Sequence, residues 1–278
     1  MEFFQENDVP DFVYGTAWKE EQTADLVHLA LEQGFRGIDT ANQRKHYYEE
    51  GVGEGLRRAY DEGIVERSKV FLQTKFTYER GQDHRLPYES DASVDEQVRQ
   101  SLERSLEHLD TDYIDSLVLH GPSSRDGLGE KDHTVWRTFE ELAETEKVGA
   151  IGISNVTPDQ LQDLIDFSNV PPACVQNRCF ARTAWDRPTR TICERNGMTY
   201  QGFSLLTANV EDLKTNAVQQ IARSHQKTLP QVVFRFAMQV GMLPLTGTTD
   251  KQHMQQDLAC TEFDLTEEEI QTIEGIAL

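Results

Sequence analysis

Val70-Phe71-Leu72-Gln73-Thr74-Lys75 is a short, mostly apolar stretch that ends in a lysine. Two further stretches of this kind surround it in the chain: residues 35–38 lead into Asp39, and residues 113–119 lead into His120. Short apolar runs separated by helical patterns are typical of parallel strands. In a closed parallel barrel the carboxyl ends of all strands meet at one mouth. We therefore expect Asp39, Lys75 and His120 to converge in one pocket.

The alternation of strand and helix patterns continues along all 278 residues. A barrel of parallel strands and helices takes about 250 residues, and no linker rich in Pro, Gly or Ser interrupts the chain. We therefore expect an α/β fold, a (β/α)8 TIM barrel that residues 1–278 form as a single domain. An open doubly wound sheet is the alternative, but no GxGxxG motif follows the first strand. The predicted strands are 12–16, 37–41, 70–75, 113–120, 148–154, 173–176, 198–203 and 242–246.

Several helices begin with a capping-box pattern, in which a Ser or Thr is followed three residues later by a Glu or Gln. The pairs are Ser93 with Glu96, Thr157 with Gln160, and Thr266 with Glu269. The connection before the last strand carries two helical patterns, at 210–223 and 230–240. The glycine cluster at 51–55 lacks the spacing of a phosphate-binding loop, so we expect it to serve helix packing.

The chain carries 48 acidic and 27 basic residues, a formal net charge of −21. Such a surface repels nucleic acid and anionic membranes, so we expect neither as a partner. The first residues lack the basic segment and the apolar run of a secretion signal. The cysteines form no CxxC pair, which favours reduced thiols and argues against a metal site. We expect a cytoplasmic monomer that acts on a small molecule.

A phenol would join the three strand-end side chains if Tyr47 reaches the same mouth. A tyrosine hydroxyl with a pKa of about 10 is a poor acid at neutral pH. We expect the Lys75 ammonium to lower that pKa and the Asp39 carboxylate to hold the lysine charged. His120 can hydrogen-bond a carbonyl oxygen. Together the four residues predict a general acid that protonates this oxygen as it gains negative charge during hydride transfer. Alone, each residue has a structural alternative, such as a turn cap for Asp39 or a core histidine for His120.

Several short motifs, in this order, resemble those of the aldo-keto reductase superfamily. They are Asp39-Thr40-Ala41, His46-Tyr47, Thr74-Lys75, Leu119-His120 and Gly152-Ile153-Ser154-Asn155. The resemblance implies a (β/α)8 barrel that reduces aldehydes or ketones with NADPH, less often with NADH, and without a Rossmann domain. A nicotinamide-binding regulatory subunit and a barrel lyase or isomerase without hydride transfer are the alternatives.

The resemblance also implies roles for single residues. Tyr47 would donate the proton, Lys75 and Asp39 would adjust the pKa of the tyrosine, and His120 would orient the carbonyl group. The residues implied to hold the nicotinamide end of the cofactor are Ser154, Asn155, Gln176 and Phe203, with Ser204 and Leu206 following in the same motif as Phe203. Those implied to line the substrate pocket are Trp18 and Phe76.

The spacing between the aspartate and the tyrosine is longer here than in the family. Arg44 stands at the usual offset, so an insertion leaves Tyr47 or Tyr48 as the proton donor. We prefer Tyr47, because Glu49 then matches the glutamate that the family carries near its tyrosine.

The end of the last predicted strand also departs from the family pattern. Leu245 replaces the lysine that the family uses for the 2′-phosphate of NADPH, and Thr246 beside it is implied to bind the cofactor. Lys251 and His253 are the remaining local cations, although both could equally face solvent. NADPH is the cofactor that the resemblance implies, with NADH as the competitor.

Overall fold

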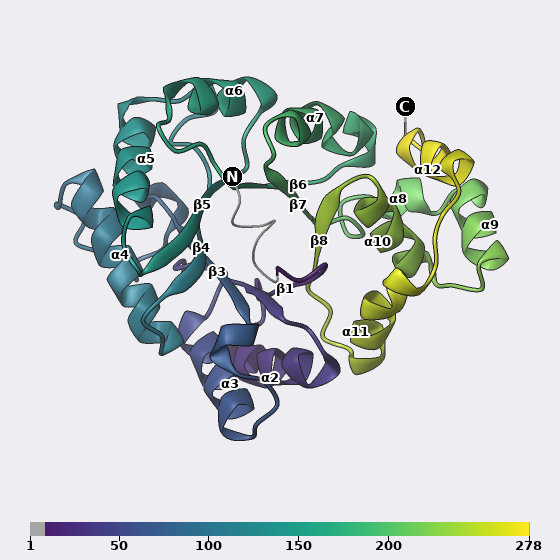
Figure 1. Cartoon of the computed structure of the whole chain (residues 1–278), viewed down its shortest axis with the longest axis horizontal. Helices are drawn as coiled ribbons and strands as arrows, with labels where there is room; N and C mark the ends of the chain where they lie inside the picture. The colour runs from purple at the N-terminus through teal and green to yellow at the C-terminus, as the bar shows by residue number, and fades with distance from the viewer. Residues whose placement is uncertain (1–8, 278) are drawn as a thin grey trace.

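The computed structural model describes residues 9–277, in which parallel strands close into a barrel in chain order. In Figure 1 the strands surround the centre of the view and the helices form an outer ring. This confirms the predicted (β/α)8 barrel. The strands are β1 (Val13–Gly15), β2 (Gly37–Asp39), β3 (Phe71–Phe76), β4 (Ile114–Leu119), β5 (Val148–Ser154), β6 (Cys174–Arg178), β7 (Thr199–Phe203) and β8 (Met242–Thr246).

Each strand is followed by at least one helix that packs on the outside of the barrel (Figure 1). The α-helices are α2 (Thr23–Gln33), α3 (Glu49–Asp61), α4 (Val94–Leu109), α5 (Glu130–Ala143), α6 (Pro158–Phe167), α7 (Arg187–Arg195), α8 (Val210–Leu213), α9 (Asn216–Ser224), α10 (Leu229–Gln239), α11 (Lys251–Leu258) and α12 (Glu267–Glu274). Short 3-10 turns are η1 (Glu20–Gln22), η2 (Arg67–Lys69), η3 (Glu79–Gly81), η4 (Ala181–Asp186) and η5 (Ala259–Glu262).

Two of the three predicted capping boxes are confirmed, at Thr157 before α6 and at Thr266 before α12. The box predicted at Ser93 is wrong. Ser93 is the N-cap residue of α4, but its side chain accepts no hydrogen bond from the helix backbone. The Ser93 hydroxyl hydrogen-bonds the Asp95 carboxylate instead, and this bond is the main cause that lowers the pKa of Asp95.

The first of the two helical patterns before β8 is also interrupted. A single helix was expected over 210–223, whereas the structure divides it into α8 and α9, with Lys214 and Thr215 between them. Thr215 has an extended backbone as the N-cap residue of α9. The Thr215 hydroxyl makes no hydrogen bond within the described residues, so the break follows from its extended backbone and not from a side-chain cap.

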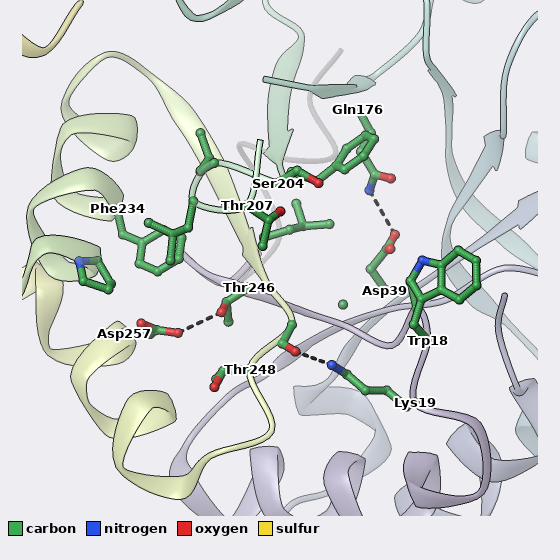
Figure 2. A pocket seen from close by; sticks show the side chains of 18 of the residues that line it. Trp18, Lys19, Asp39, Gln176, Ser204, Thr207, Phe234, Thr246, Thr248 and Asp257 are labelled. Atoms are coloured by element: carbon green, nitrogen blue, oxygen red, sulfur yellow. Dashed lines mark hydrogen bonds between the residues drawn. The ribbon is translucent and has the colours of Figure 1, made fainter. Parts of the chain in front are cut away.

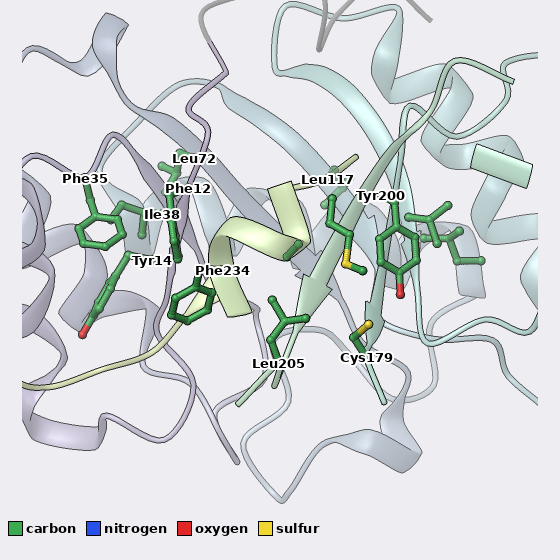
Figure 3. Close-up of a cluster of buried hydrophobic side chains, with 14 of the residues drawn as sticks. Phe12, Tyr14, Phe35, Ile38, Leu72, Leu117, Cys179, Tyr200, Leu205 and Phe234 are labelled. Atoms are coloured by element: carbon green, nitrogen blue, oxygen red, sulfur yellow. The ribbon is translucent and has the colours of Figure 1, made fainter. Parts of the chain in front are cut away.

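The apolar core lies between the strands and the outer helices. Side chains alternate across a strand, so Leu72 of β3 packs outward into this core while Gln73 and Lys75 point into the barrel. The ring of Phe12 contacts those of Phe35 and Phe234 in edge-to-face geometry (Figure 3). On β3 the side chains that face the barrel interior near its mouth are therefore polar.

The glycine cluster at 51–55 serves helix packing, as expected. A Cβ atom on Gly53 would lie 2.1 Å from the backbone oxygen of His108 in α4, and one on Gly55 would lie 2.6 Å from the backbone oxygen of Ala24 in α2. Only glycine allows helix α3 to approach both neighbours this closely. This packing fixes the start of α3, immediately after Tyr47 and Tyr48.

The long connections after β3 and β4 are tied to the barrel body. Tyr88 donates its hydroxyl to the Thr77 carbonyl group. Asp132 of α5 accepts hydrogen bonds from the backbone of Ser123 and of Gly129. Within residues 9–277, none of the helices has the length and apolar character needed to cross a membrane.

Candidate active site

A cavity of about 610 Å³ opens at the carboxyl ends of the strands. Its wall contains the final residues of several strands: Gly15, Asp39, Ser154, Phe203 and Thr246. The predicted site residues that line it are Trp18, Asp39, Tyr47, His120, Ser154, Asn155, Gln176, Phe203, Ser204, Leu206, Thr246 and His253. Lys75 lies directly behind Asp39, whereas Phe76 and Lys251 lie elsewhere.

Asp39 and Lys75 form a buried ion pair at the ends of β2 and β3. The Lys75 Nζ atom lies 2.6 Å from Oδ1 and 2.7 Å from Oδ2 of Asp39, and 2.7 Å from the Thr40 carbonyl oxygen. The two side chains are almost fully buried. A buried pair is tolerated only when its remaining donors and acceptors are satisfied, and here the three N–H groups of the ammonium all have acceptors.

Tyr47 lies against this pair. The Lys75 Nζ atom is 5.3 Å from the centroid of the Tyr47 ring, and the His120 ring is 5.9 Å from it in edge-to-face geometry. Burial, followed by the negative charge of Asp39, raises the pKa of the Tyr47 hydroxyl. The expected lowering by Lys75 is therefore wrong, because desolvation disfavours the charged phenolate and the Asp39 carboxylate repels it.

Tyr48 occupies a different environment from Tyr47. It does not line the cavity, and the Arg44 guanidinium lies 4.2 Å from the centroid of its ring. Glu49, the first residue of α3, is buried and accepts hydrogen bonds from Thr74 of β3 and from Ser105 of α4. Glu49 thus anchors the segment that carries both tyrosines to β3, with Tyr47 on the cavity side.

His120 is a neutral imidazole in this site. Burial, and then the positive charge of Lys75, lower its pKa to about 3. Its Nδ1 atom lies 2.7 Å from the Thr77 hydroxyl oxygen, and no described residue hydrogen-bonds its Nε2 atom. Thr77 was not identified from the sequence, although it follows Lys75 closely in the chain.

Ser154, Asn155 and Gln176 are joined by hydrogen bonds on the wall next to His120. The Ser154 hydroxyl donates to the Gln176 carbonyl oxygen at 2.6 Å, and the Asn155 amide donates to the His120 carbonyl oxygen at 2.7 Å. The Gln176 side-chain amide nitrogen donates to Asp39 Oδ1 at 3.0 Å, and Figure 2 shows this contact. Within residues 9–277, neither Asn155 Oδ1 nor Gln176 Oε1 accepts a hydrogen bond from the protein.

The opposite end of the cavity is formed by β8 and α11 (Figure 2). Thr246 donates its hydroxyl to Asp257 at 2.8 Å. Burial raises the pKa of the Asp257 carboxyl to about 6. His253 lines this end, whereas Lys251 does not; its Nζ atom lies 3.9 Å from a carboxylate oxygen of Glu32 on the outer surface.

Lys19 is a cation on the cavity wall that the sequence analysis missed. Its ammonium donates to the Gly247 carbonyl oxygen, so its side chain links the β1 and β8 loops (Figure 2). Burial lowers its pKa. The sequence did contain one indication of this position, since Lys19 directly follows Trp18, which was predicted to line the pocket.

Of the two residues predicted to line the substrate pocket, one lines the cavity and the other is buried outside the barrel. Trp18 lies on the cavity wall, 68% exposed, with its ring 4.1 Å from that of His46. Phe76 is 1% exposed and packs in the outer core against Tyr78 and Tyr88, with ring centroids 5.4 and 5.7 Å away. Since Lys75 points into the barrel, its neighbour must point outward, so the placement of Phe76 in the pocket is wrong.

Residues 11–278 match the model of the aldo/keto reductase family. The 9,11-endoperoxide prostaglandin H2 reductase of Trypanosoma cruzi is 32% identical over 92% of this chain and 82% of its own length. The NAD(P)H-dependent D-xylose reductase of Pachysolen tannophilus is 27% identical over 92% of this chain and 86% of its own.

Among solved structures, an aldo/keto reductase from Brucella melitensis has a TM-score of 0.83 and 25% sequence identity, covering 99% of this chain and 98% of that protein. The same barrel fold therefore accompanies the match in sequence. The chain belongs to the aldo/keto reductase family.

Proposed function

We propose that this protein is a single-domain NAD(P)H-dependent reductase of aldehydes or ketones in which Tyr47 donates the proton. The observation that carries the proposal is the position of Tyr47. Its ring lies between the Asp39–Lys75 pair and His120 at one end of a long cavity. Among the family members, the D-xylose reductase of Pachysolen tannophilus is named for NAD(P)H dependence, which supports a nicotinamide cofactor here.

The cavity wall fits a nicotinamide dinucleotide by its chemistry. Asn155 Oδ1 and Gln176 Oε1 are acceptors that a carboxamide N–H group can satisfy. Phe203 lines the cavity and offers the flat apolar face that ring stacking requires. Lys19 on the same wall is a cation that could pair with a pyrophosphate. A carboxamide site, a stacking face and a cation thus line one cavity.

When bound, the dihydronicotinamide supplies the hydride that reduces the carbonyl carbon. The residues of the chain handle the proton. The raised pKa of Tyr47 keeps its hydroxyl protonated until an oxygen beside it gains negative charge, and it then donates to that oxygen. Asp39 and Lys75 remain a charged pair behind the ring and provide a preorganised field for the tyrosinate left behind.

His120 positions the carbonyl oxygen. We assign the imidazole proton to Nε2, with Nδ1 accepting from the Thr77 hydroxyl 2.7 Å away, because Nε2 is the nitrogen that no described residue hydrogen-bonds. An N–H group at Nε2 can donate to the same carbonyl oxygen that Tyr47 protonates. Two donors on one oxygen fix the orientation of the carbonyl group and stabilise its developing charge.

The choice between NADPH and NADH depends on the β8–α11 end. NADPH remains the proposed cofactor, with His253 rather than Lys251 as the side chain for its 2′-phosphate, because of these two residues His253 lines the cavity and Lys251 does not. Leu245 and the carboxyl group of Asp257 are on the same wall and give that phosphate no support, which keeps NADH as the competitor.

The proposal is tested by titrating the protein's tryptophan fluorescence with NADPH and, separately, with NADH. Saturable quenching is expected, since Trp18 lies on the cavity wall. The tighter cofactor is then used in an absorbance assay with a panel of carbonyl compounds that includes an aldose, a dicarbonyl and an aromatic aldehyde. Absence of quenching by either cofactor, together with no turnover of the panel, would overturn the proposal.

A further inference from the structure

The barrel interior below the cavity contains three buried glutamines, one each from β3, β6 and β7. Gln73 and Gln201 have no exposed surface, and Gln176 has 3%. Gln73 is the register partner of Asp39, and Gln201 is the register partner of Gln176. Barrel interiors are usually filled by bulky apolar side chains. A layer of buried amides is costly unless every polar atom is hydrogen-bonded.

The amide of Gln73 is fully hydrogen-bonded. Its Nε2 atom donates to Asp39 Oδ1 at 2.7 Å and to Gln201 Oε1 at 2.8 Å. Its Oε1 atom accepts from the Ser116 hydroxyl at 2.9 Å and from Gln201 Nε2 at 3.0 Å. Gln73 and Gln201 therefore form a reciprocal amide pair, and one remaining donor of that pair is directed at the Asp39 carboxylate.

Gln176 completes a closed set of contacts around Asp39. Its Nε2 atom donates to Asp39 Oδ1 at 3.0 Å and to Gln201 Oε1 at 2.9 Å. Together with Lys75, the two glutamines give Asp39 Oδ1 three N–H donors. The Asp39 carboxylate, which binds Lys75 behind Tyr47, is thus itself fixed by hydrogen bonds from the glutamine layer below it.

The contacts fix which way each amide faces. Rotating the Gln73 amide by half a turn would place its oxygen against Asp39 Oδ1, an acceptor against an acceptor. The same rotation of Gln176 would place its oxygen against both Asp39 Oδ1 and Gln201 Oε1. The orientation that satisfies the donors of Gln73 and Gln176 leaves Gln176 Oε1 as the free acceptor on the cavity wall.

We propose that Gln73 is a positioning residue for carbonyl reduction: through its amide nitrogen it fixes the carboxylate of Asp39, and through Gln201 it fixes the amide of Gln176. This inference rests on the proposed function, because it assigns Gln73 to the same reaction. Gln73 does not line the cavity, so it acts only through Asp39 and Gln176. One layer of side chains then sets both the field behind Tyr47 and the acceptor for the cofactor.

The test uses two substitutions at this position in the full-length protein. Gln73→Met keeps the length of the side chain and removes both donors. Gln73→Glu keeps an acceptor for Ser116 and Gln201 but places a carboxyl oxygen against Asp39. The control is Gln239→Met, since Gln239 also makes a reciprocal pair of amide hydrogen bonds, with the backbone of Leu265, far from the cavity.

For each protein, thermal unfolding, the dissociation constant of the cofactor, and kcat and KM are measured from acidic to alkaline pH. We expect Gln73→Met to lower kcat by about ten- to a hundred-fold, the effect of misplacing a reacting group by a fraction of an ångström to an ångström, with little change in the substrate KM. Gln239→Met should keep the kcat of the unsubstituted protein.

The pH profile separates positioning from a general loss of stability. The kcat of Gln73→Glu, relative to the unsubstituted protein, should recover as pH falls, because a protonated carboxyl donates a hydrogen bond to Asp39 whereas an ionised one repels it. Folded variants with an unchanged kcat and an unchanged pH profile would overturn the inference while leaving the proposed function intact. Failure of the unsubstituted protein to bind cofactor or reduce any carbonyl compound would instead overturn the proposed function.

Discussion

Lys75 donates to both carboxylate oxygens of Asp39, at 2.6 and 2.7 Å, and its third N–H group is taken by the Thr40 carbonyl oxygen. The ammonium therefore has no donor left for the Tyr47 hydroxyl. It acts on the tyrosine through its field across 5.3 Å to the ring centroid. Burial and the Asp39 charge raise the pKa of the phenol, so it keeps its proton, as a general acid must do before the reacting oxygen becomes basic.

Tyr47→Phe should lower the turnover of any carbonyl substrate by about a hundred-fold or more, the usual contribution of a general acid. The dissociation constant of the cofactor should change little, because the phenyl ring remains. Steady-state kinetics and fluorescence titration measure the two effects.

The matched control is Tyr48→Phe. Tyr48 packs against Arg44 and lies off the cavity, so this variant should keep near-normal turnover. Loss of activity in Tyr48→Phe with retention in Tyr47→Phe would show that the donor has been misassigned by one position.

Lys75→Met should lose both activity and stability. Removing the ammonium leaves the Asp39 carboxylate buried without its cation, which costs about 3–5 kcal/mol of unfolding free energy. Denaturant unfolding measures this cost, and kcat measures the loss of the field behind Tyr47. A Lys75→Met protein with normal kcat and an unchanged pH profile would remove the lysine from the mechanism.

The sequence predicted the strands and the strand-end residues because both follow from local patterns. An apolar run that ends in Asp39, Lys75 or His120 places the side chain at the mouth whatever the helices outside do. The alternation of side chains along β3 would also have predicted that Phe76 points away from the mouth, since Lys75 and Phe76 cannot face the same side.

The predictions that failed concern properties that depend on tertiary burial. The direction of the Tyr47 pKa shift follows from how completely the ring is desolvated and from the Asp39 charge, and neither can be obtained from residue types. The hydrogen bonds of Gln73 could not be predicted for the same reason, because an isolated glutamine in a strand gives no indication of its partners. Similarly, Lys251 and His253 lie two positions apart on α11, about 200° around the helix, so only one can face the cavity.

Leu245→Lys should tighten NADPH binding more than NADH binding. Leu245 lines the β8–α11 end of the cavity, and an ammonium there would pair with a 2′-phosphate that only NADPH carries. His253→Ala should weaken NADPH binding selectively. Lys251→Ala, on the outer surface near Glu32, is the control and should leave both dissociation constants unchanged. Equal effects of the three substitutions on the two cofactors would place the 2′-phosphate site elsewhere.

Asp257 makes stability depend on pH in a direction opposite to most carboxyl groups. Burial raises its pKa from 3.8 to about 6 in the folded protein. Between these values the folded state binds more protons than the unfolded state, so this group's contribution to stability is greatest below pH 3.8 and falls as pH rises through about 6.

Asp257→Asn removes this ionisation and retains an acceptor for the Thr246 hydroxyl. The variant should therefore be more stable than the unsubstituted protein at pH values above about 6, and the advantage should shrink as the pH is lowered toward 3.8. Denaturant midpoints measured for both proteins across this range give the comparison directly. A stability difference that stays constant with pH would mean that Asp257 does not titrate in this window, and that the wall at Thr246 carries a full negative charge toward any phosphate bound there.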